Sequence, residues 1–127
     1  TGAELIMADI LDVTVIIKRN GRDVTGFPYQ KRMVVDEIQQ FSYEKATGGG
    51  YETLPTTQIA AVQALVLTAD QSISLRLDGQ SDAGITLNAG GLLLVLDSNL
   101  DAGVSTNATL DNSSGSTAVV TGLGAGT

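Results

Sequence analysis

The stretch that decides the fold is DVTVIIKRNGRDV, residues 12–24, because it combines strand periodicity with a turn signal. Apolar and polar side chains alternate along its first half and then meet Asn20-Gly21. Both turn residues tolerate the positive φ angles of a type I′ turn. Closing this turn places Lys18 opposite Asp23 as an ion pair and Ile17 opposite Val24 as an apolar pair. The segment therefore predicts a β-hairpin with one buried face.

Further short segments suited to strands follow along the chain, each bounded by Gly, Pro, Asp or Asn. They are residues 31–35, 38–45, 51–54, 64–68, 72–77, 85–87, 92–96, 104–110 and 116–123. The run around residues 64–68 is apolar throughout, which predicts a strand covered on both faces, although residues 57–64 also suit a short helix. We expect one all-β domain, an antiparallel β-sandwich or jelly-roll-like barrel with little helix. Residues 1–36 would form an N-terminal arm and hairpin, and residues 37–127 the main sandwich.

Charge is distributed unevenly in this 127-residue chain, whose net charge is −7. Six of its seven basic residues lie within residues 1–52, and the rest of the chain is acidic. An acidic protein is a poor partner for nucleic acid and for anionic membranes, so we expect neither. No apolar run approaches the roughly 20 residues that span a bilayer, and no signal peptide is apparent. The first residue is Thr1, and a natural start at Met7 or upstream processing both stay open.

The residue types needed for most catalytic centres are missing, because the chain contains neither histidine nor cysteine. This removes the common nucleophile systems and zinc sites. Glu44 and Glu52 are the only candidate pair of glycosidase carboxylates, and we interpret them as loop residues. The segment Asp97–Asp101 spaces oxygen ligands as a calcium loop does, but Ala102 and Ala108 occupy the places of the EF-hand glycine and glutamate. We therefore predict no catalytic, cofactor or metal site, and no loss of stability on calcium chelation.

The C-terminal two-thirds of the chain, roughly residues 37–127, resembles small structural proteins of tailed-phage virions. The resemblance lies in the apolar strand at residues 62–67, the polar break Asp70-Gln71, the alternating strand at 72–77, the segment 85–92 (ITLNAGGL) and an Asn/Ser/Gly-rich last strand. Such proteins serve as capsid decoration, neck or collar pieces, or tail and fibre adaptors. The resemblance implies location in a virion and self-association, often as trimers. It assigns no functional residues.

We expect a non-enzymatic virion protein that binds capsid, neck or tail proteins, and we predict two contact surfaces for it. The basic hairpin turn should bind the protein partner, through Lys18, Arg19, Asn20, Gly21 and Arg22. The apolar run at residues 58–67 should form the seam of a homo-oligomer, with a trimer favoured, through Ile59, Val62 and Leu65. The alternative is a carbohydrate- or receptor-binding module, calcium-assisted or not, which would need aromatic side chains on a concave face. The candidates for that face are Phe27, Phe41, Tyr43 and Tyr51.

Overall fold

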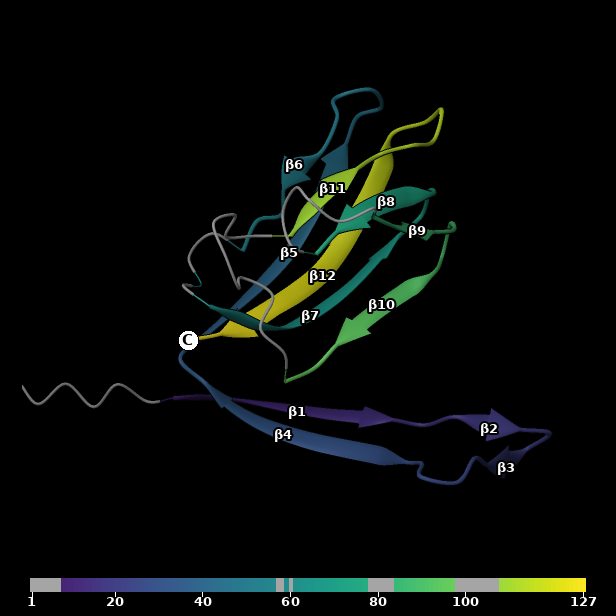
Figure 1. The fold of residues 1–127 in the computed structure, drawn as a ribbon, viewed down its shortest axis with the longest axis vertical. Helices are drawn as coiled ribbons and strands as arrows, with labels where there is room; N and C mark the ends of the chain where they lie inside the picture. The colour runs from purple at the N-terminus through teal and green to yellow at the C-terminus, as the bar shows by residue number, and fades with distance from the viewer. Residues whose placement is uncertain (1–7, 57–58, 60, 78–83, 98–107) are drawn as a thin grey trace, which may run out of the picture.

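The fold is an all-β sandwich that carries a long hairpin arm (Figure 1). The computed structural model describes residues 8–56, 59, 61–77, 84–97 and 108–127. Its strands are β1 (Asp9–Val15), β2 (Lys18–Arg19), β3 (Arg22–Asp23), β4 (Tyr29–Val35), β5 (Glu37–Lys45), β6 (Glu52–Thr53), β7 (Val62–Ala69), β8 (Ile73–Arg76), β9 (Ile85–Leu87), β10 (Leu92–Val95), β11 (Thr109–Asp111) and β12 (Ala118–Gly126). The described residues contain no helix. The predicted antiparallel β-sandwich is confirmed.

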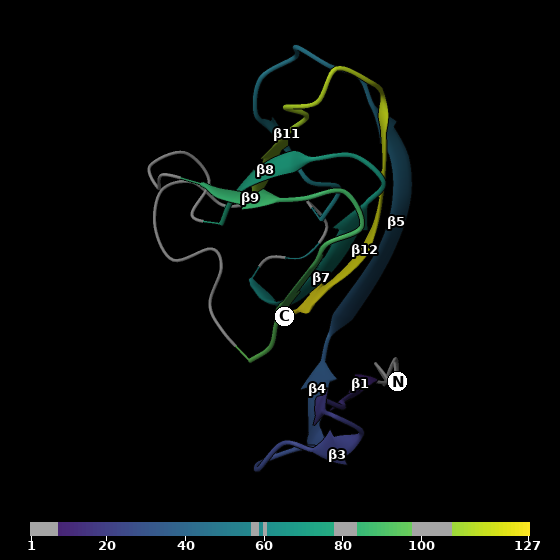
Figure 2. The same cartoon turned by 90° about the vertical axis from the view of Figure 1, so that its right-hand side faces the viewer.

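Two four-stranded sheets form the body of the protein, residues 37–127, and Figure 2 shows them as two layers. Sheet 1 has the order β10-β7-β12-β5, and sheet 2 has the order β6-β11-β8-β9. All pairs in both sheets are antiparallel. Strands alternate their side chains between two faces, so each sheet contributes one face to a shared core and turns the other outward.

The core between the sheets is aliphatic, as the composition predicts. Its fully buried side chains come from both sheets and from the segment before β7, and include Leu54, Leu65, Leu67, Ile73, Leu75, Leu110 and Val120. Burial of each such side chain contributes roughly 1.5–3 kcal/mol. Phe41 and Tyr43 add one aromatic pair, with ring centroids 6.1 Å apart. The stability of the protein therefore resides in this body.

Strand β7 lies in the middle of sheet 1, which corrects the expected oligomer seam. Ile59, Val62 and Leu65 are 2%, 3% and 1% exposed and belong to the sandwich core. They cannot form a seam because the opposite sheet already covers them. The predicted strand is confirmed, and Leu65, Leu67 and Ala69 are buried in the core. Its predicted cover on both faces is found only at Ala64, because Val66 and Thr68 on the outer face are half-buried. Residues 57, 58 and 60 of the alternative helix lie outside the described residues, and Val62–Ala64 are in the strand.

The arm is a long antiparallel hairpin made of β1 and β4, with β2 and β3 at its tip (Figure 1). At the tip the strand register places Lys18 opposite Asp23 and Arg19 opposite Arg22, as predicted. Asn20 and Gly21 have φ angles of 52° and 79°, which confirms the positive-φ turn. Ile17 departs from the prediction of a buried face, because its side chain is 43% exposed. No second layer covers the hairpin at this point, so its apolar face stays open to solvent.

The base of the arm is held by a small second core on the outer face of sheet 1. Met33 and Val35 of β4 are buried there against Ala64 of β7 and Ala125 of β12. The two alanines leave room for the larger side chains of the arm, and Leu11, Ile38, Leu96 and Leu123 surround the contact. The backbone of Asp36 also donates a hydrogen bond to the carbonyl of Gly126, at 2.9 Å. The body therefore anchors the base of the arm by packing and by backbone hydrogen bonding.

Candidate assembly surface

The two faces of the arm differ in chemistry, and the register of β1 and β4 assigns the residues to them. Directly paired residues share a face, so one face combines Leu11, Val13, Val15, Tyr29, Lys31, Met33 and Val35, with Asp9 at its base end opposite Val35. We call this set the apolar face of the arm. The other face carries Asp12, Thr14, Gln30 and Arg32 between Ile10 and Val34. Its charges pair with each other, because Arg32 Nε donates to Asp12 Oδ1 at 2.8 Å. This ion pair raises the pKa of Arg32.

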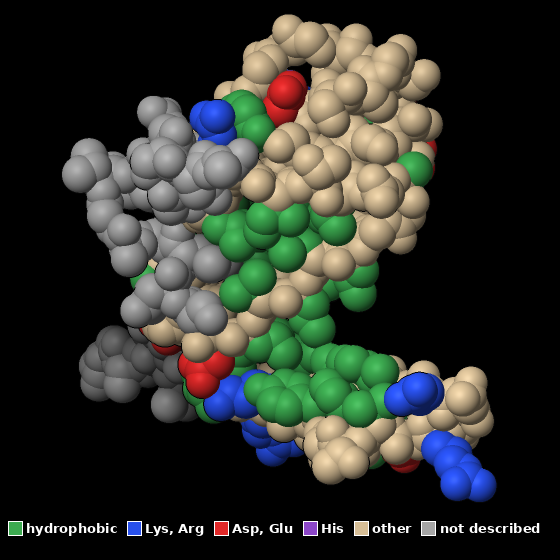
Figure 3. Space-filling model, turned by 45° about the vertical axis from the view of Figure 1, so that its right-hand side comes forward, with side chains coloured by type: hydrophobic (Ala, Val, Ile, Leu, Met, Phe, Trp, Pro, Cys, Tyr) green, Lys and Arg blue, Asp and Glu red, His purple; other side chains and the backbone are tan. Residues whose placement is uncertain are grey.

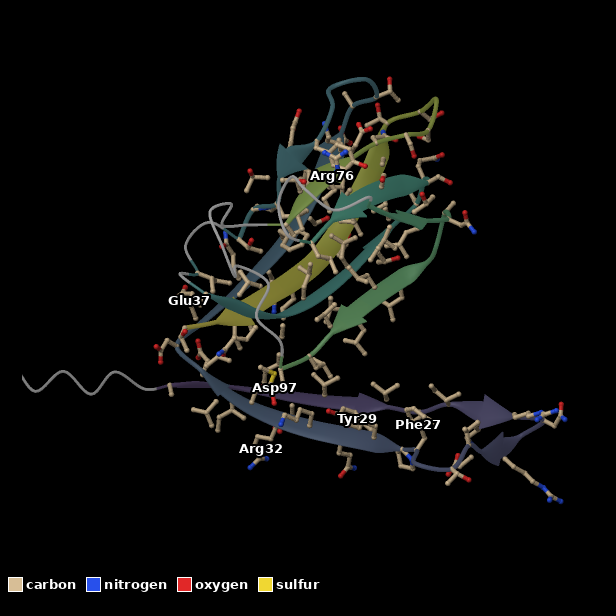
Figure 4. All side chains as sticks on the ribbon, viewed as in Figure 1. Phe27, Tyr29, Arg32, Glu37, Arg76 and Asp97 are labelled. Atoms are coloured by element: carbon tan, nitrogen blue, oxygen red, sulfur yellow. The ribbon has the colours of Figure 1, made fainter. Side chains whose placement is uncertain are left out.

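Among the residues that the structure describes, those of the body bury only the base of the apolar face. Met33 and Val35 are buried, whereas Val13 and Val15 are half-buried and Tyr29 is 40% exposed. Figure 3 shows a continuous hydrophobic surface along the arm, flanked by basic side chains. Phe27 and Tyr29 both lie on the outer half of the arm (Figure 4). An unpartnered row of apolar side chains of this kind is typical of an interaction surface.

The tip of the arm, residues 18–23, is solvent-exposed and basic. All the residues predicted to bind the partner lie in it, so the structure brings Lys18, Arg19, Asn20, Gly21 and Arg22 together at one turn. With Asp23 included, the tip carries three positive charges and one negative charge. Arg19 and Arg22 are direct cross-strand neighbours, and like charges in this arrangement repel each other. The tip is therefore suited to contact with an acidic surface.

An ion pair links the arm to the end of β10. Lys31 Nζ lies 2.9 Å from Asp97 Oδ2, and this hydrogen bond raises the pKa of Lys31. Figure 4 shows Asp97 in the space between body and arm, while Arg32 points away from the body. The Asp-rich sequence predicts a turn that faces solvent here, and the Asp97 side chain is 61% exposed while its carboxylate also contacts the arm. The remainder of the suggested calcium loop, residues 98–101, lies outside the described residues.

The outer face of sheet 1 offers a second accessible apolar surface, next to the covered base. Leu65, Leu67 and Ala69 of β7 point into the core, so Val66 and Thr68 point outward. The pairing places Leu123 and Leu94 beside Val66, and Thr121 and Leu92 beside Thr68. All of these except Leu94 line a shallow groove of about 500 Å³, together with Gln40, Phe41, Ser42 and Gly122. We call it the sheet groove, and Leu92 at its side is 63% exposed.

Acidic side chains lie beyond the groove along the same strands. Glu44 follows Ser42 on the outer face of β5, and its partner across the strands is the exposed Val119. Asp70 directly follows β7 and accepts a hydrogen bond from the backbone of Val119 at 2.8 Å. The sheet groove therefore runs from the apolar base of the arm toward two carboxylates. The alternation of residues along β5, β7 and β12 predicts which side chains share a face of each strand. Only the pairing of these strands shows that the faces join into one groove.

The proposed glycosidase pair does not form, because its two carboxylates lie in different sheets. Glu44 is on the outer face of sheet 1, and Glu52 is on β6 of sheet 2. Glu52 Oε1 pairs instead with the buried Lys45 Nζ at 2.9 Å. Burial, and secondarily the charge of Glu52, raise the pKa of the neighbouring Tyr43 to about 12. These side chains form a structural polar cluster at the end of the sandwich far from the arm.

Other buried polar and aromatic groups also have structural partners. The Asn112 side chain donates to the carbonyls of Lys45 and Ser116, at 2.8 Å each, and accepts from the backbone of Ser114 at 3.0 Å. It thereby shapes the turn between β11 and β12. Arg76 lies 4.0 Å above the ring of Tyr51, whose hydroxyl contacts the Ser74 hydroxyl at 2.6 Å. Of the four rings considered for carbohydrate binding, only Phe27 lies on the arm, and Phe41 and Tyr43 belong to the core.

Within the described segments, no group of three or more carboxylates is placed to hold a metal ion. The same segments include no helix long and apolar enough to cross a bilayer. Comparison of the chain with protein families, with characterised proteins and with solved structures finds no match in any of the three.

Proposed function

We propose that this protein is a non-enzymatic structural protein of a tailed-phage virion, which attaches to capsid, neck or tail proteins through its arm. The observation that carries the proposal is the arm itself, a hairpin that extends from a well-packed sandwich and exposes apolar and basic side chains. An isolated two-stranded hairpin is at best marginally stable in water, so an extended one suits a contact with another surface. The resemblance of residues 37–127 to small virion proteins supplies the context.

The charge distribution supports attachment by the arm rather than by the body. Residues 8–36 hold five Lys or Arg and four Asp or Glu, whereas residues 37–127 hold two Lys or Arg and nine Asp or Glu. An acidic body keeps copies apart in solution, and a basic tip is attracted to acidic protein surfaces. The chemistry of the described residues gives no comparable support to catalysis or to glycan binding.

The test begins with particles of the phage whose genome encodes this chain. Mass spectrometry of purified particles should detect the protein, and recombinant protein should rebind to particles from which it has been removed. Changing Lys18, Arg19 and Arg22 to Gln should weaken rebinding at least about tenfold, because charged contacts at an interface rim govern encounter and salt dependence.

The matched control alters net charge equally at the far end of the body. Ala46, Thr47 and Thr117 are all exposed, and changing each to Glu lowers the charge by the same three units. This variant should rebind like the unmodified protein. Absence of the chain from the particles, or equal loss of rebinding in the two variants, would contradict the proposal.

A further inference from the structure

We propose that the first neighbour of the arm is a second copy of this chain, and that the arm of one copy lies in the sheet groove of the next. This inference deepens the proposed function, on which it rests: the arms join copies of this chain to one another as well as to the capsid, neck or tail proteins. It joins two accessible apolar surfaces formed by the described residues, the outer half of the apolar face and the sheet groove.

Within one copy, the protein already makes the kind of contact that we propose between copies. At the base of the arm, Met33 and Val35 of the apolar face pack on the outer face of sheet 1 at Ala64 and Ala125. Beyond the base, Val13, Val15 and Tyr29 continue the apolar face, and Val66, Leu94 and Leu123 continue the sheet. Tyr29 on the arm and Leu92 beside the groove are both exposed, so both surfaces are accessible to a neighbour.

Charge complementarity selects the arm as the occupant of the groove. Two bodies placed face to face would bring together two chains of nine carboxylates and two cations each, which repel. The arm is the only basic region of the sequence, and Lys18, Arg19 and Arg22 follow directly after its apolar residues. Glu44 and Asp70 likewise follow the groove on β5 and β7. Apolar side chains of the arm therefore meet apolar side chains of the groove, and basic side chains meet carboxylates, in the same order along both surfaces.

The dimensions of the two surfaces agree. At about 3.3 Å per residue, Val13 to Lys18 of the arm spans about 17 Å. Val66 to Asp70 along β7 spans about 13 Å by the same rise, and the long lysine side chain covers the difference. With Val13 above Val66, the basic tip therefore reaches the two carboxylates.

Because arm and groove are different surfaces, the contact is heterologous. Heterologous contacts close into rings when the rotation between copies allows and otherwise build open filaments. Arranged about a two-fold axis, the same arm-and-groove contact would occur twice in a dimer in which each copy gives and receives an arm. The expected trimer is one such ring. Each copy then contributes both of its open apolar surfaces to the assembly, which is why neither is covered in the isolated chain.

Disulfide trapping tests the contact directly, because the chain has no cysteine of its own. Val15→Cys on the apolar face and Leu92→Cys beside the groove are prepared as separate full-length proteins. On mixing under mild oxidation, they should cross-link to each other at least about tenfold more than either does to itself. Thr14→Cys is the control, because it neighbours Val15 in sequence but lies on the opposite face of the arm. When Thr14→Cys is mixed with Leu92→Cys, the two variants should cross-link to each other no more than each does to itself.

Sedimentation of the unmodified protein, without any particle, provides the second measurement. It should show a dimer or a small ring at tens of micromolar and low salt, and the Lys18, Arg19 and Arg22 to Glu variant should dissociate. Adding Glu44→Lys to that variant should restore part of the association. The inference would be overturned if the protein sediments as a monomer under all conditions, or if Val15→Cys cross-links to Leu92→Cys no more than Thr14→Cys does. It would also be overturned if Val15→Cys cross-links mainly to a second copy of itself. These experiments use purified protein alone, so they can fail while particle rebinding succeeds, and the reverse.

Discussion

The arm and the body are built from similar antiparallel strands, but they use their apolar side chains in opposite ways. In the body, the alternating residues of two sheets meet in one core, where Leu65, Leu75 and Leu110 are essentially fully buried. In the arm, the same alternation creates an apolar face that has no second layer beyond its base. The arm contributes five of the eight large exposed hydrophobic residues found in the described chain: Ile10, Ile16, Ile17, Tyr29 and Val34. The comparison separates a region that stabilises the fold from a region that stays available for contact.

The largest effect should come from removing core volume in the body. Leu75→Ala deletes a side chain with 0% exposure and should lower the free energy of unfolding by about 3 kcal/mol, the usual cost of such a cavity. Val34→Ala on the arm, where the side chain is 66% exposed, should change it by less than about 0.5 kcal/mol. Urea denaturation of both variants measures the difference. Similar losses would show that the arm is part of the stabilising core.

A glycine in β12 tests how closely the body is packed. A Cβ at Gly122 would lie 2.7 Å from Cζ of Phe41 and would also meet the carbonyl of Val66. Gly122→Ala should therefore destabilise the protein by roughly 1–3 kcal/mol through overpacking. Gly115→Ala is the matched control, because nothing lies within 4 Å of its added Cβ. If thermal melting shows equal shifts for the two variants, Phe41 moves more freely than the packing indicates.

The polar cluster at the far end of the body should make stability depend on pH above 10. Burial raises the pKa of Tyr43 from 10.0 to about 12, so the folded protein holds this proton more tightly than the unfolded chain. The resulting stability is complete below pH 10 and is lost as the pH rises toward 12. After discounting for the partial exposure of the ring, the loss is about 1 kcal/mol.

Tyr43→Phe isolates this contribution, because phenylalanine has no proton to lose. Urea midpoints measured on both sides of pH 10 should fall less for the variant than for the unmodified protein. Parallel pH profiles would mean that lysine deprotonation elsewhere causes the change.

The smallest effect should come from the ion pair between the arm and the body. Asp97→Asn removes the partner of Lys31, so the pKa of Lys31 should fall back toward its ordinary value of 10.5. The unfolding midpoint should not change measurably, because exposed ion pairs contribute little to stability. NMR titration of the Lys31 side chain reports the pKa, and Asp111→Asn serves as the control. An unaltered Lys31 pKa would show that the pair does not form in solution.

The sequence by itself determined the class of fold and several local elements, because these depend on neighbouring residues. Period-two alternation predicted most of the strands, and Asn20-Gly21 predicted the tip and its register. The absence of histidine and cysteine also limits the available chemistry, whatever shape the chain adopts. Each of these conclusions rests on backbone preferences and side-chain types that act over a few residues.

Tertiary structure alone decided which apolar residues are buried and which stay open. Ile59, Val62 and Leu65 looked like an oligomer seam, but all three are buried in the core between the sheets, and β12 and β10 flank the strand that holds Val62 and Leu65. The pairing of β1 with β4 turned two short alternating segments into one arm, and Lys31 into the partner of Asp97. The sheet groove combines residues from four strands scattered between positions 40 and 123. Hydrophobicity is a property of a residue, whereas exposure depends on what the rest of the chain places next to it.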